Sequence, residues 1–559
     1  MSSPAHAALA GDENIVVDVR RHVPSITLNA DGLSVTAATI DGNPAAVSFN
    51  GPLQQATFVA AAGLDPGRHV LALHFARSGS ASNQYGMMET HPGRMSLFES
   101  SLARTVFPCF DEPEFRARFS VHVQTPKGPT VISNMPVTAR QRLDDGNVRW
   151  NFAQTPPMPV YLLTVDIGPF VAVQGTADGI PIAVWTRPED AAHARTVLQD
   201  AERFLPFYHT FFGIPYPLPK LDIVVGRLGT QTALEGWGAI NIYSSYEAFG
   251  GQFGGGIAGR RDAAQVLAHE MAHQWVGDLV TMRWWRDTFV AEGLAEFAQR
   301  QAMQRVYPSL ASWRSDEYDI ATLMDTPVGP QMGPALVDVK TDLESDAENA
   351  FTSATYTKGA SILDGWHEFV GDARFHRRLT GYLRTFAYRS ATYEDFWRAM
   401  GGATGVHYGL AWLAQRGHPV VSVDWHCHAN QTSISLAQEP FVADRSVQPS
   451  YRRQRWPIPL TVALDRRTTA LLFEGRRSVL TVRGCGIPRF DTWATQYYRL
   501  RYPRKHYAEV ARNLKAATER ERDRFYMDTA ALTATGYLDD GTFVKTFAVK
   551  PNIDPELYA

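Results

Sequence analysis

The chain has 559 residues, of which 45% are hydrophobic and 20% charged, and its formal net charge is -3. This length is several times that of an ordinary domain, so we expect three or four domains with separate cores. The nearly balanced charge favours neither a nucleic-acid partner nor an anionic membrane. The start of the chain does not match a signal peptide, and no run of about 18 apolar residues follows, so the sequence predicts a cytoplasmic protein.

Three cysteines, Cys109, Cys427 and Cys485, lie far apart in the sequence and form no CxxC pair. This number and spacing match neither a disulfide framework nor a structural zinc ribbon. We therefore expect three thiols that are buried or idle.

The first 170 residues show the alternation typical of β-strands. In the segment HVLALHF, the residues Leu71, Leu73 and Phe75 share one face, and Asp-Gly and Asp-Pro-Gly turn signals separate segments of this kind. The pattern predicts a β-rich domain at the beginning of the chain.

Helical periodicity begins near EDAAHARTVLQDAERFLPFYHTFF and continues to about WLAQRGHPVV, with a probable strand at KLDIVVG. A glycine-rich stretch at 250–259 suits a surface loop. Alternating segments such as IPLTVAL and ALLFEG then return, followed by a helical end of the chain. The fold class is therefore multidomain α+β, and the expected domains are 1–171, 172–419, 420–498 and 499–559.

The segment AHEMAHQW places His269 and His273 four residues apart, with Glu270 between them. Asp262 and Gln265 match a helix N-cap and its capping-box partner, so we expect a helix to begin there. Residues four apart are neighbours on a helix, so two imidazoles can converge on one tetrahedral ion with bonds of about 2.0 to 2.1 Å. Two hydrogen-bonded core histidines are the simpler alternative, but an accidental HExxH occurs in only roughly a few per cent of such chains.

A catalytic zinc ion needs three protein ligands and one open position for water. Glu292 is the candidate third ligand, because it follows His273 after 18 residues on a second helix predicted to begin near Asp287. Glu296, one turn further along, is a candidate acceptor for a ligand histidine, and a solvated helix charge is the alternative. The motif predicts one zinc ion per chain.

HExxH followed after 18 residues by a glutamate resembles the zinc aminopeptidases of the aminopeptidase N type, a gluzincin family. Other segments are similar to stretches of that family in the same order: FPCFDEPEFRARF, TPPMPVYLLTVDIGPF, TYTKGASIL, WLAQRGHPVVSV and YYRLRYP. The resemblance runs from about Leu28 to Leu538. It implies an N-terminal β-sheet saddle domain, a thermolysin-like catalytic domain, a small β-sandwich and a partial C-terminal helical domain.

The resemblance also implies which residues bind the free α-amino group of a peptide. Glu235 matches the glutamate of the family's Gly-Ala-Met-Glu-Asn segment, and Ala233 would lie along the substrate on an edge strand. Glu99 matches a second amine-binding glutamate, with an ordinary surface charge as the alternative. In the family mechanism, Glu270 would be the general base and Tyr356 would donate a hydrogen bond to the oxyanion.

Several positions depart from the family pattern. Thr232, Leu234 and Gly236 differ around the first glutamate, which puts the shape of the first side-chain pocket in question. Leu97 replaces a polar residue two positions before the second glutamate, and we expect this change to weaken amine binding or alter preference. Near the third metal ligand, Arg286 and Ala291 replace family asparagines.

Compared with the family, this chain is a short member. From the resemblance we expect the β domain to lack the family's first strand or two, and the C-terminal helical domain to contain two or three helices. We expect a more open site that admits longer peptides, or a homo-oligomer in which another subunit supplies the missing wall.

Three interpretations compete at this point. A zinc aminopeptidase acting on peptides with a free N-terminus explains the whole set of polar residues. The same fold and metal could instead serve an endopeptidase or an epoxide hydrolase. A non-catalytic interaction scaffold is the third interpretation, which the presence of every metal ligand makes less favourable.

Overall fold

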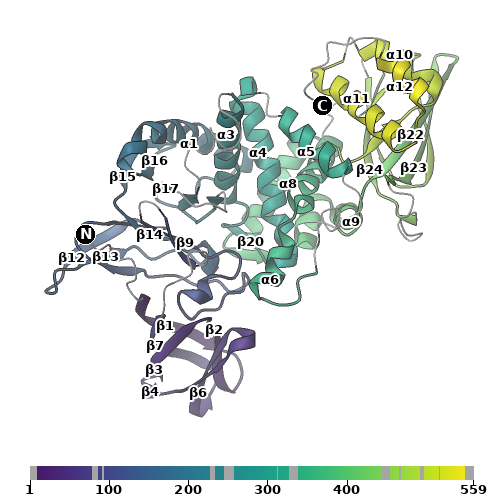
Figure 1. Cartoon of the computed structure of the whole chain (residues 1–559). Coiled ribbons are helices and arrows are strands. Elements are labelled where there is room, and N and C mark those ends of the chain that lie inside the picture. Colours follow the sequence, from purple (N-terminus) through teal and green to yellow (C-terminus); the bar gives the residue numbers. More distant parts are fainter. Residues whose placement is uncertain are drawn as a thin grey trace.

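We describe a computed structural model of the chain (Figure 1). The structure describes residues 9–77, 86–90, 93–226, 233–243, 257–310, 313–325, 336, 338–443, 453–464, 467–490, 496–514 and 517–547. The glycine-rich stretch predicted as a loop lies outside these residues, apart from 257–259, and Thr232 lies outside them as well.

The N-terminal part of the described chain consists of β-sheets, as the alternation predicts. The strand orders are β1-β7-β3-β4, β2-β6-β5, β10-β13-β12 and β11-β14-β9-β8. The strands are β1 (Leu9–Val19), β2 (Val23–Asn29), β3 (Leu33–Ile40), β4 (Asn43–Pro44), β5 (Ala46–Asn50), β6 (Gln55–Leu64), β7 (Gly67–Arg77), β8 (Gly86–Glu89), β9 (Arg94–Leu97), β10 (His122–Thr125), β11 (Thr130–Ser133), β12 (Val137–Arg142), β13 (Val148–Phe152) and β14 (Val165–Gly168). Strand β9 leads directly into the segment that carries Glu99.

A second part combines a mixed sheet with helices (Figure 1). The sheet order is β15-β16-β17-β19-β18, so that the short strand with Ala233 lies at one edge among the described strands. The strands are β15 (Val171–Ala177), β16 (Ile180–Thr186), β17 (Leu221–Val225), β18 (Ala233–Leu234), β19 (Ala239–Ile242), β20 (Val280–Met282) and β21 (Arg389–Ala391). The helices are α1 (Ala191–Phe212), α3 (Ile257–His273), α4 (Glu292–Val306), α5 (Trp313–Asp325), α6 (Glu344–Ala347), α7 (Gly359–Val370), α8 (Asp372–Phe386) and α9 (Tyr393–Leu413).

The start of the helix with the HExxH motif differs from the prediction. Helix α3 begins at Ile257, so Asp262 is not its N-cap and instead pairs with the neighbouring Arg261 at 3.0 Å. A tertiary contact supports the extra turn, because Arg260 pairs at 2.5 Å with Asp200 of α1. The capping signal in the sequence is local and does not include this contact.

The C-terminal part contains two sheets and three described helices. The strand orders are β26-β23-β22-β28 and β25-β24-β27. The elements are β22 (Pro419–His428), β23 (Gln431–Pro440), β24 (Ile458–Leu464), β25 (Arg467–Phe473), β26 (Arg477–Arg483), β27 (Arg489–Phe490), β28 (Arg499–Arg501), α10 (Arg504–Asn513), α11 (Glu519–Ala534) and α12 (Asp540–Phe547). The mixed α+β architecture with an N-terminal β-rich part is confirmed, and the four domain boundaries stay predictions.

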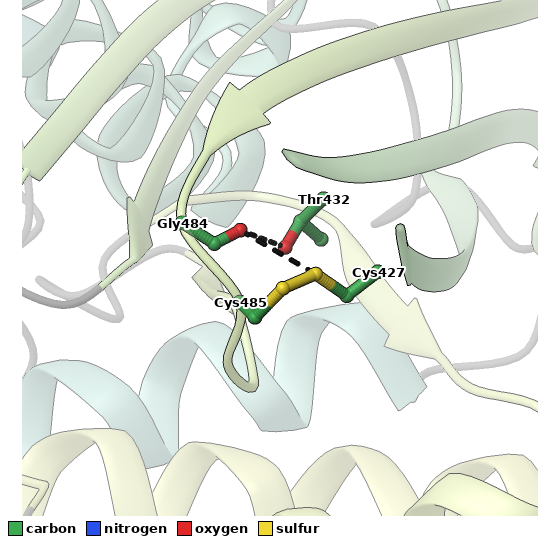
Figure 2. The surroundings of a disulfide bond; sticks show 4 residues. All are labelled: Cys427, Thr432, Gly484 and Cys485. Carbon is green, nitrogen blue, oxygen red and sulfur yellow. Dashed lines mark hydrogen bonds between the residues drawn. A yellow bond between two sulfur atoms is a disulfide. The ribbon is translucent and has the colours of Figure 1, made fainter. Parts of the chain in front are cut away.

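The prediction of three thiols is wrong for two of the cysteines (Figure 2). Cys427 near the end of β22 and Cys485 just after β26 form a disulfide, with their Cα atoms 5.5 Å apart. Strand β23 lies between those two strands, and the hydroxyl of Thr432 donates to the carbonyl of Gly484 at 2.7 Å. Because the two cysteines are 58 positions apart in the sequence, only sheet pairing brings them together. Cys109 is buried and free, as expected.

Of the helices that the structure describes, none combines the length and the apolar character needed to cross a lipid bilayer.

Candidate active site

The three predicted metal ligands lie together at the ends of two helices. His269 and His273 end α3, and Glu292 is the first residue of α4. The two histidine Nε2 atoms lie 3.0 Å apart, and Oε2 of Glu292 lies 3.1 Å from the first and 3.3 Å from the second. Ligand atoms bonded at 2.0 to 2.1 Å to a tetrahedral zinc ion are about 3.3 Å apart. The three atoms therefore form a triangle that fits a zinc ion.

Two glycines allow the helices behind this site to approach closely. A Cβ atom at Gly293 would lie 3.1 Å from the carbonyl oxygen of Thr355, and one at Gly359 would lie 3.4 Å from the Cα of Gly293. The backbones of α4 and α7 are therefore nearly in contact at this point. This packing brings the turn with Tyr356 beside Glu292.

The second ring nitrogen of each histidine has a partner. Nδ1 of His273 donates to the carbonyl of Val276 at 2.9 Å, and Nδ1 of His269 lies 3.5 Å from Oε2 of Glu296. The other oxygen of Glu296 accepts from the buried Arg300 at 3.2 Å. When Nδ1 carries the proton, Nε2 presents its lone pair to a metal ion. Glu296 thus lies where the sequence predicts an acceptor for a ligand histidine.

Glu270 is buried beside these residues. Burial raises the pKa of its carboxyl to about 7, although His269 and His273 lower this pKa, and the nearby Glu235 and Glu292 add to the rise. A carboxylate with a pKa near neutrality can both accept and return a proton, which is what general acid-base catalysis requires.

Tyr356 lies in a π-helical turn, Ala354–Lys358, that continues into α7. Its ring is stacked on the imidazole of His269, with the ring centroids 5.9 Å apart. Burial and the surrounding carboxylates raise the pKa of the Tyr356 hydroxyl well above its usual value, so the hydroxyl keeps its proton. Such π-helical turns are rare and occur frequently at functional sites.

A group of three carboxylates adjoins the histidines. One oxygen each of Glu99, Glu235 and Glu292 lies within 4.8 Å of the others. Within the described part of the chain, Oε1 of Glu99 and Oε1 of Glu235 are buried and have no hydrogen-bond partner. Burial raises the pKa of the carboxyl groups of Glu99 and Glu235. The charged groups around each glutamate also shift its pKa. A buried carboxylate without a partner is costly, and a cationic donor would remove this cost.

Gln274, which follows the HExxH motif directly, holds the segment that contains Glu235. Its side-chain nitrogen donates to the backbone carbonyl of Glu235 at 3.1 Å, and its side-chain oxygen accepts from the backbone N–H of Gly238 at 2.9 Å. The indole of Trp237 donates to the backbone carbonyl of Gln274 at 3.2 Å. The sequence reasoning missed this residue, since a single glutamine carries no spacing signal; its position beside the motif was the only hint.

The segment with Glu99 is held in place by a different residue, Glu344. The hydroxyl of Ser100 and the backbone N–H of Ser101 both donate to Oε2 of Glu344, at 2.8 and 2.7 Å. Glu344 begins α6, so residues 244 positions apart in the chain hold this segment in place.

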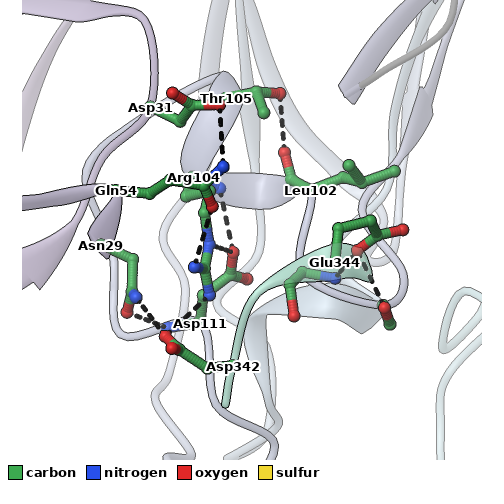
Figure 3. A network of polar contacts seen from close by, with 11 residues as sticks. Asn29, Asp31, Gln54, Leu102, Arg104, Thr105, Asp111, Asp342 and Glu344 are labelled. Carbon is green, nitrogen blue, oxygen red and sulfur yellow. Dashed lines mark hydrogen bonds and ion pairs between the residues drawn. The ribbon is translucent and has the colours of Figure 1, made fainter. Parts of the chain in front are cut away.

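An ion-pair network lies next to this anchor (Figure 3). The buried Arg104 donates to Asp111 at 2.8 Å, to Asp342 at 3.1 Å and to Gln54 at 3.3 Å. Asn29 also donates to Asp342, at 2.5 Å. Buried charges are tolerated only when their hydrogen bonds are largely satisfied, as they are around this guanidinium. Asp111, the aspartate of the FPCFDEP segment, accepts from Arg104 and donates its backbone N–H to Asn29 at the end of β2, so it helps to hold the N-terminal sheets to this network.

Three of the departures from the family pattern, Leu97, Leu234 and Gly236, have structural explanations. Leu97 and Leu234 contribute to one buried apolar cluster, so both serve packing. A Cβ atom at Gly236 would lie 2.1 Å from the hydroxyl of Thr164 and 2.3 Å from the carbonyl oxygen of Ala239. Position 236 therefore has no room for the asparagine of the family motif unless the backbone moves.

Comparisons with known proteins agree with this geometry. The Peptidase family M1 domain matches residues 196–416, and the Peptidase M1 N-terminal domain matches residues 3–162. The chain belongs to the M1 peptidase family, whose members are gluzincins of the aminopeptidase N type.

Named relatives cover much of this chain. Aminopeptidase M1-D of Oryza sativa subsp. japonica is 29% identical over 479 residues, which are 82% of this chain and 53% of the relative. Leucyl aminopeptidase of Saccharolobus solfataricus is 31% identical over 388 residues, 68% of this chain and 48% of the relative. Puromycin-sensitive aminopeptidase of Caenorhabditis elegans is 28% identical over 473 residues, 81% of this chain and 49% of the relative. The chain thus spans about half the length of the curated relatives it matches.

Proposed function

We propose that the protein is a zinc-dependent aminopeptidase that removes the first residue from peptides with a free N-terminus. One observation carries this proposal: the two unpartnered carboxylate oxygens of Glu99 and Glu235 lie beside a triangle of nitrogen and oxygen atoms with the spacing of zinc ligands. In a peptide substrate, the α-ammonium group and the first peptide bond lie on either side of the first residue. The carboxylates would then bind the ammonium group while the metal site faces that peptide bond.

His269, His273 and Glu292 would hold one zinc ion per chain. Their nitrogen and carboxylate donors suit zinc, and a three-ligand set leaves a position for water. A zinc ion at such a site supplies Lewis acidity, which lowers the pKa of water and polarises a carbonyl group.

Glu270 would take a proton from the attacking water and pass it to the leaving amine. Its carboxyl is buried directly beside the proposed metal ligands, where it can accept a proton from water and return it to the leaving amine. Tyr356 would donate a hydrogen bond to the oxyanion that forms from the peptide carbonyl, because its hydroxyl stays protonated.

Glu99 and Glu235 would bind the α-ammonium group, and Ala233 on the edge strand β18 would offer backbone groups to the extended substrate. Neither an endopeptidase nor an epoxide hydrolase has to bind a free α-ammonium group, so neither activity needs two carboxylates at this place. A non-catalytic scaffold would have no reason to retain a buried general base.

The decisive experiment is hydrolysis of a panel of aminoacyl arylamides, each paired with its N-acetylated twin, with the Glu270→Gln protein as the blank. We expect cleavage of the free-amine substrates only, and none by the variant. Equal cleavage of the acetylated twins would favour an endopeptidase. No cleavage by zinc-loaded protein would favour the scaffold.

A cytoplasmic location and a homo-oligomeric state stay predictions. The disulfide between Cys427 and Cys485 weighs against the first, because disulfides persist mainly in oxidising compartments. Alkylation of the protein in intact cells, followed by mass spectrometry, would measure the fraction of these two cysteines that is oxidised.

A further inference from the structure

A second cluster of two histidines and a carboxylate lies at the corner between α7 and α8. His367 is in the last turn of α7, Asp372 is the first residue of α8, and His376 is one turn further along α8. Oδ1 of Asp372 lies 3.1 Å from Nε2 of His367 and 3.3 Å from Nε2 of His376. One donor atom from each of the three residues lies within 4.8 Å of the others.

These distances match those of the active-site cluster. There too, one carboxylate oxygen lies 3.1 Å from the first histidine nitrogen and 3.3 Å from the second. Both pairs of distances agree with the separation of about 3.3 Å between ligands of a tetrahedral zinc ion. His367 follows Tyr356 by eleven residues on the same continuous helix, so the second cluster lies roughly 16 Å along the helix axis from the active site. It is a separate site.

The imidazole of His376 is held in the orientation that metal binding needs. Its Nδ1 donates to the backbone carbonyl of Phe211, in the last turn of α1, at 3.0 Å. With the proton on Nδ1, the lone pair of Nε2 points to Asp372. A hydrogen bond from the second nitrogen to a backbone carbonyl is the usual way in which proteins orient a ligand histidine.

His367 is also held in place. Its ring packs on Phe375, with the centroids 4.6 Å apart, and meets the edge of Phe297 at 5.8 Å. Asp372 is 79% exposed, so an ion can reach the cluster from solvent.

We propose that His367, Asp372 and His376 form a second metal site, which binds a divalent transition metal ion of the Zn2+ class. Two imidazoles and one carboxylate favour zinc, cobalt or nickel over calcium and magnesium, which prefer sets of oxygen ligands. The ion joins the end of α7 to the start of α8, and through His376 both are tied to α1. Its role is structural, because the exposed cluster lies away from the groups proposed to bind substrate.

The test measures metal content at buffered free zinc for four proteins: the unmodified chain, Asp372→Ala, His376→Gln and the control Asp178→Ala. In the control, the substituted residue Asp178 contacts a single histidine, since its carboxylate lies 3.0 Å from Nδ1 of His209. The control therefore removes a surface contact between an aspartate and a histidine without removing a ligand of the proposed site. We expect the unmodified chain and the control to bind one more equivalent of zinc per chain than the other two. Cobalt should give a visible ligand-field spectrum from the second equivalent in the first pair of proteins only.

Melting curves recorded with and without zinc provide an independent measurement. Zinc should raise the melting temperature of the unmodified chain more than that of Asp372→Ala, because an ion that binds only the folded state stabilises it. Hydrolysis at saturating zinc should be unchanged in Asp372→Ala, so the outcome does not depend on the proposed function. Equal zinc content in all four proteins would overturn the proposal and leave only hydrogen bonds between Asp372 and its two histidines.

Discussion

Two regions of this molecule each place one carboxylate oxygen 3.1 and 3.3 Å from the nitrogens of two histidines, yet in different surroundings. At the end of α3 the cluster is buried, and His273 has a side-chain exposure of only 1%. At the corner of α7 and α8 the exposures are 18% for His367, 28% for His376 and 79% for Asp372. Around the first cluster lie a buried glutamate, a tyrosine that keeps its proton, and two further glutamates that each have one buried oxygen without a partner among the described residues.

The comparison shows that ligand spacing alone does not make an enzyme. In either place, the distances from the carboxylate oxygen to the two histidine nitrogens suit a tetrahedral zinc ion. Hydrolysis also requires a general base and a hydrogen-bond donor to the oxyanion. It requires in addition that bulk water be excluded, because electrostatic interactions are stronger in a dry site. Substitutions in and around the two clusters should therefore have very different effects on activity.

The largest effect is expected for Glu270→Gln, because the amide cannot accept the proton of water. We expect kcat to fall by about 10²- to 10⁴-fold while zinc content stays unchanged. Steady-state kinetics on an aminoacyl arylamide, together with metal analysis, measures both quantities. Asp372→Ala is the matched control, with zinc content reduced and kcat retained. A Glu270→Gln protein with normal activity would remove this residue from the mechanism.

Tyr356→Phe should lower kcat by about 10²- to 10³-fold, with a smaller change in KM. The substitution keeps the ring that stacks on His269 and removes only the hydroxyl. A change confined to KM would mean that the tyrosine binds the substrate and does not stabilise the oxyanion.

Glu235→Gln should lower kcat/KM for free-amine substrates by about 10- to 100-fold, since hydrogen bonds to charged groups contribute about 1.5 to 3 kcal/mol. The amide fits the same space and keeps the backbone contact to Gln274. Any residual cleavage of the N-acetylated twin should not fall in parallel. Parallel loss on both substrates would indicate a structural role for Glu235.

The smallest effect on turnover is expected for Glu296→Gln, which weakens the contact behind His269. Loss of such a contact typically lowers metal affinity by about 10- to 100-fold. At saturating zinc, kcat should stay close to that of the unmodified chain, and the chelator concentration needed for half-inactivation should fall. Unchanged resistance to chelator would show that the carboxylate does not support the ligand.

Much of this organisation could be predicted from local patterns. The alternation of HVLALHF and the periodicity that begins at residue 189 correspond to β7 and α1 in the structure. The HExxH spacing predicts that His269 and His273 converge, because four residues make one helical turn. The N-cap at Asp262 was predicted wrongly, since the ion pair between Arg260 and Asp200 that supports the extra turn joins distant parts of the chain.

Long-range contacts account for what could not be predicted. The disulfide between Cys427 and Cys485 depends on the order of strands in a sheet. The anchoring of the Glu99 segment by Glu344 and of the Glu235 segment by Gln274 depends on side chains with no recognisable spacing. The cluster of His367, Asp372 and His376 depends on the turn between two helices.

By itself, the sequence determined the chemistry that is available, because residue type and helical spacing decide which donors can meet on one helix face. The need for a third zinc ligand indicated Glu292, and family resemblance then indicated Tyr356, Glu99 and Glu235 as further members of the set. Only the tertiary structure decided which described carboxylate oxygens are buried without a partner and which helices approach closely through their glycines. The reason is physical: burial and the electrostatic surroundings of a group arise from every element packed around it, and these elements come from distant parts of the chain.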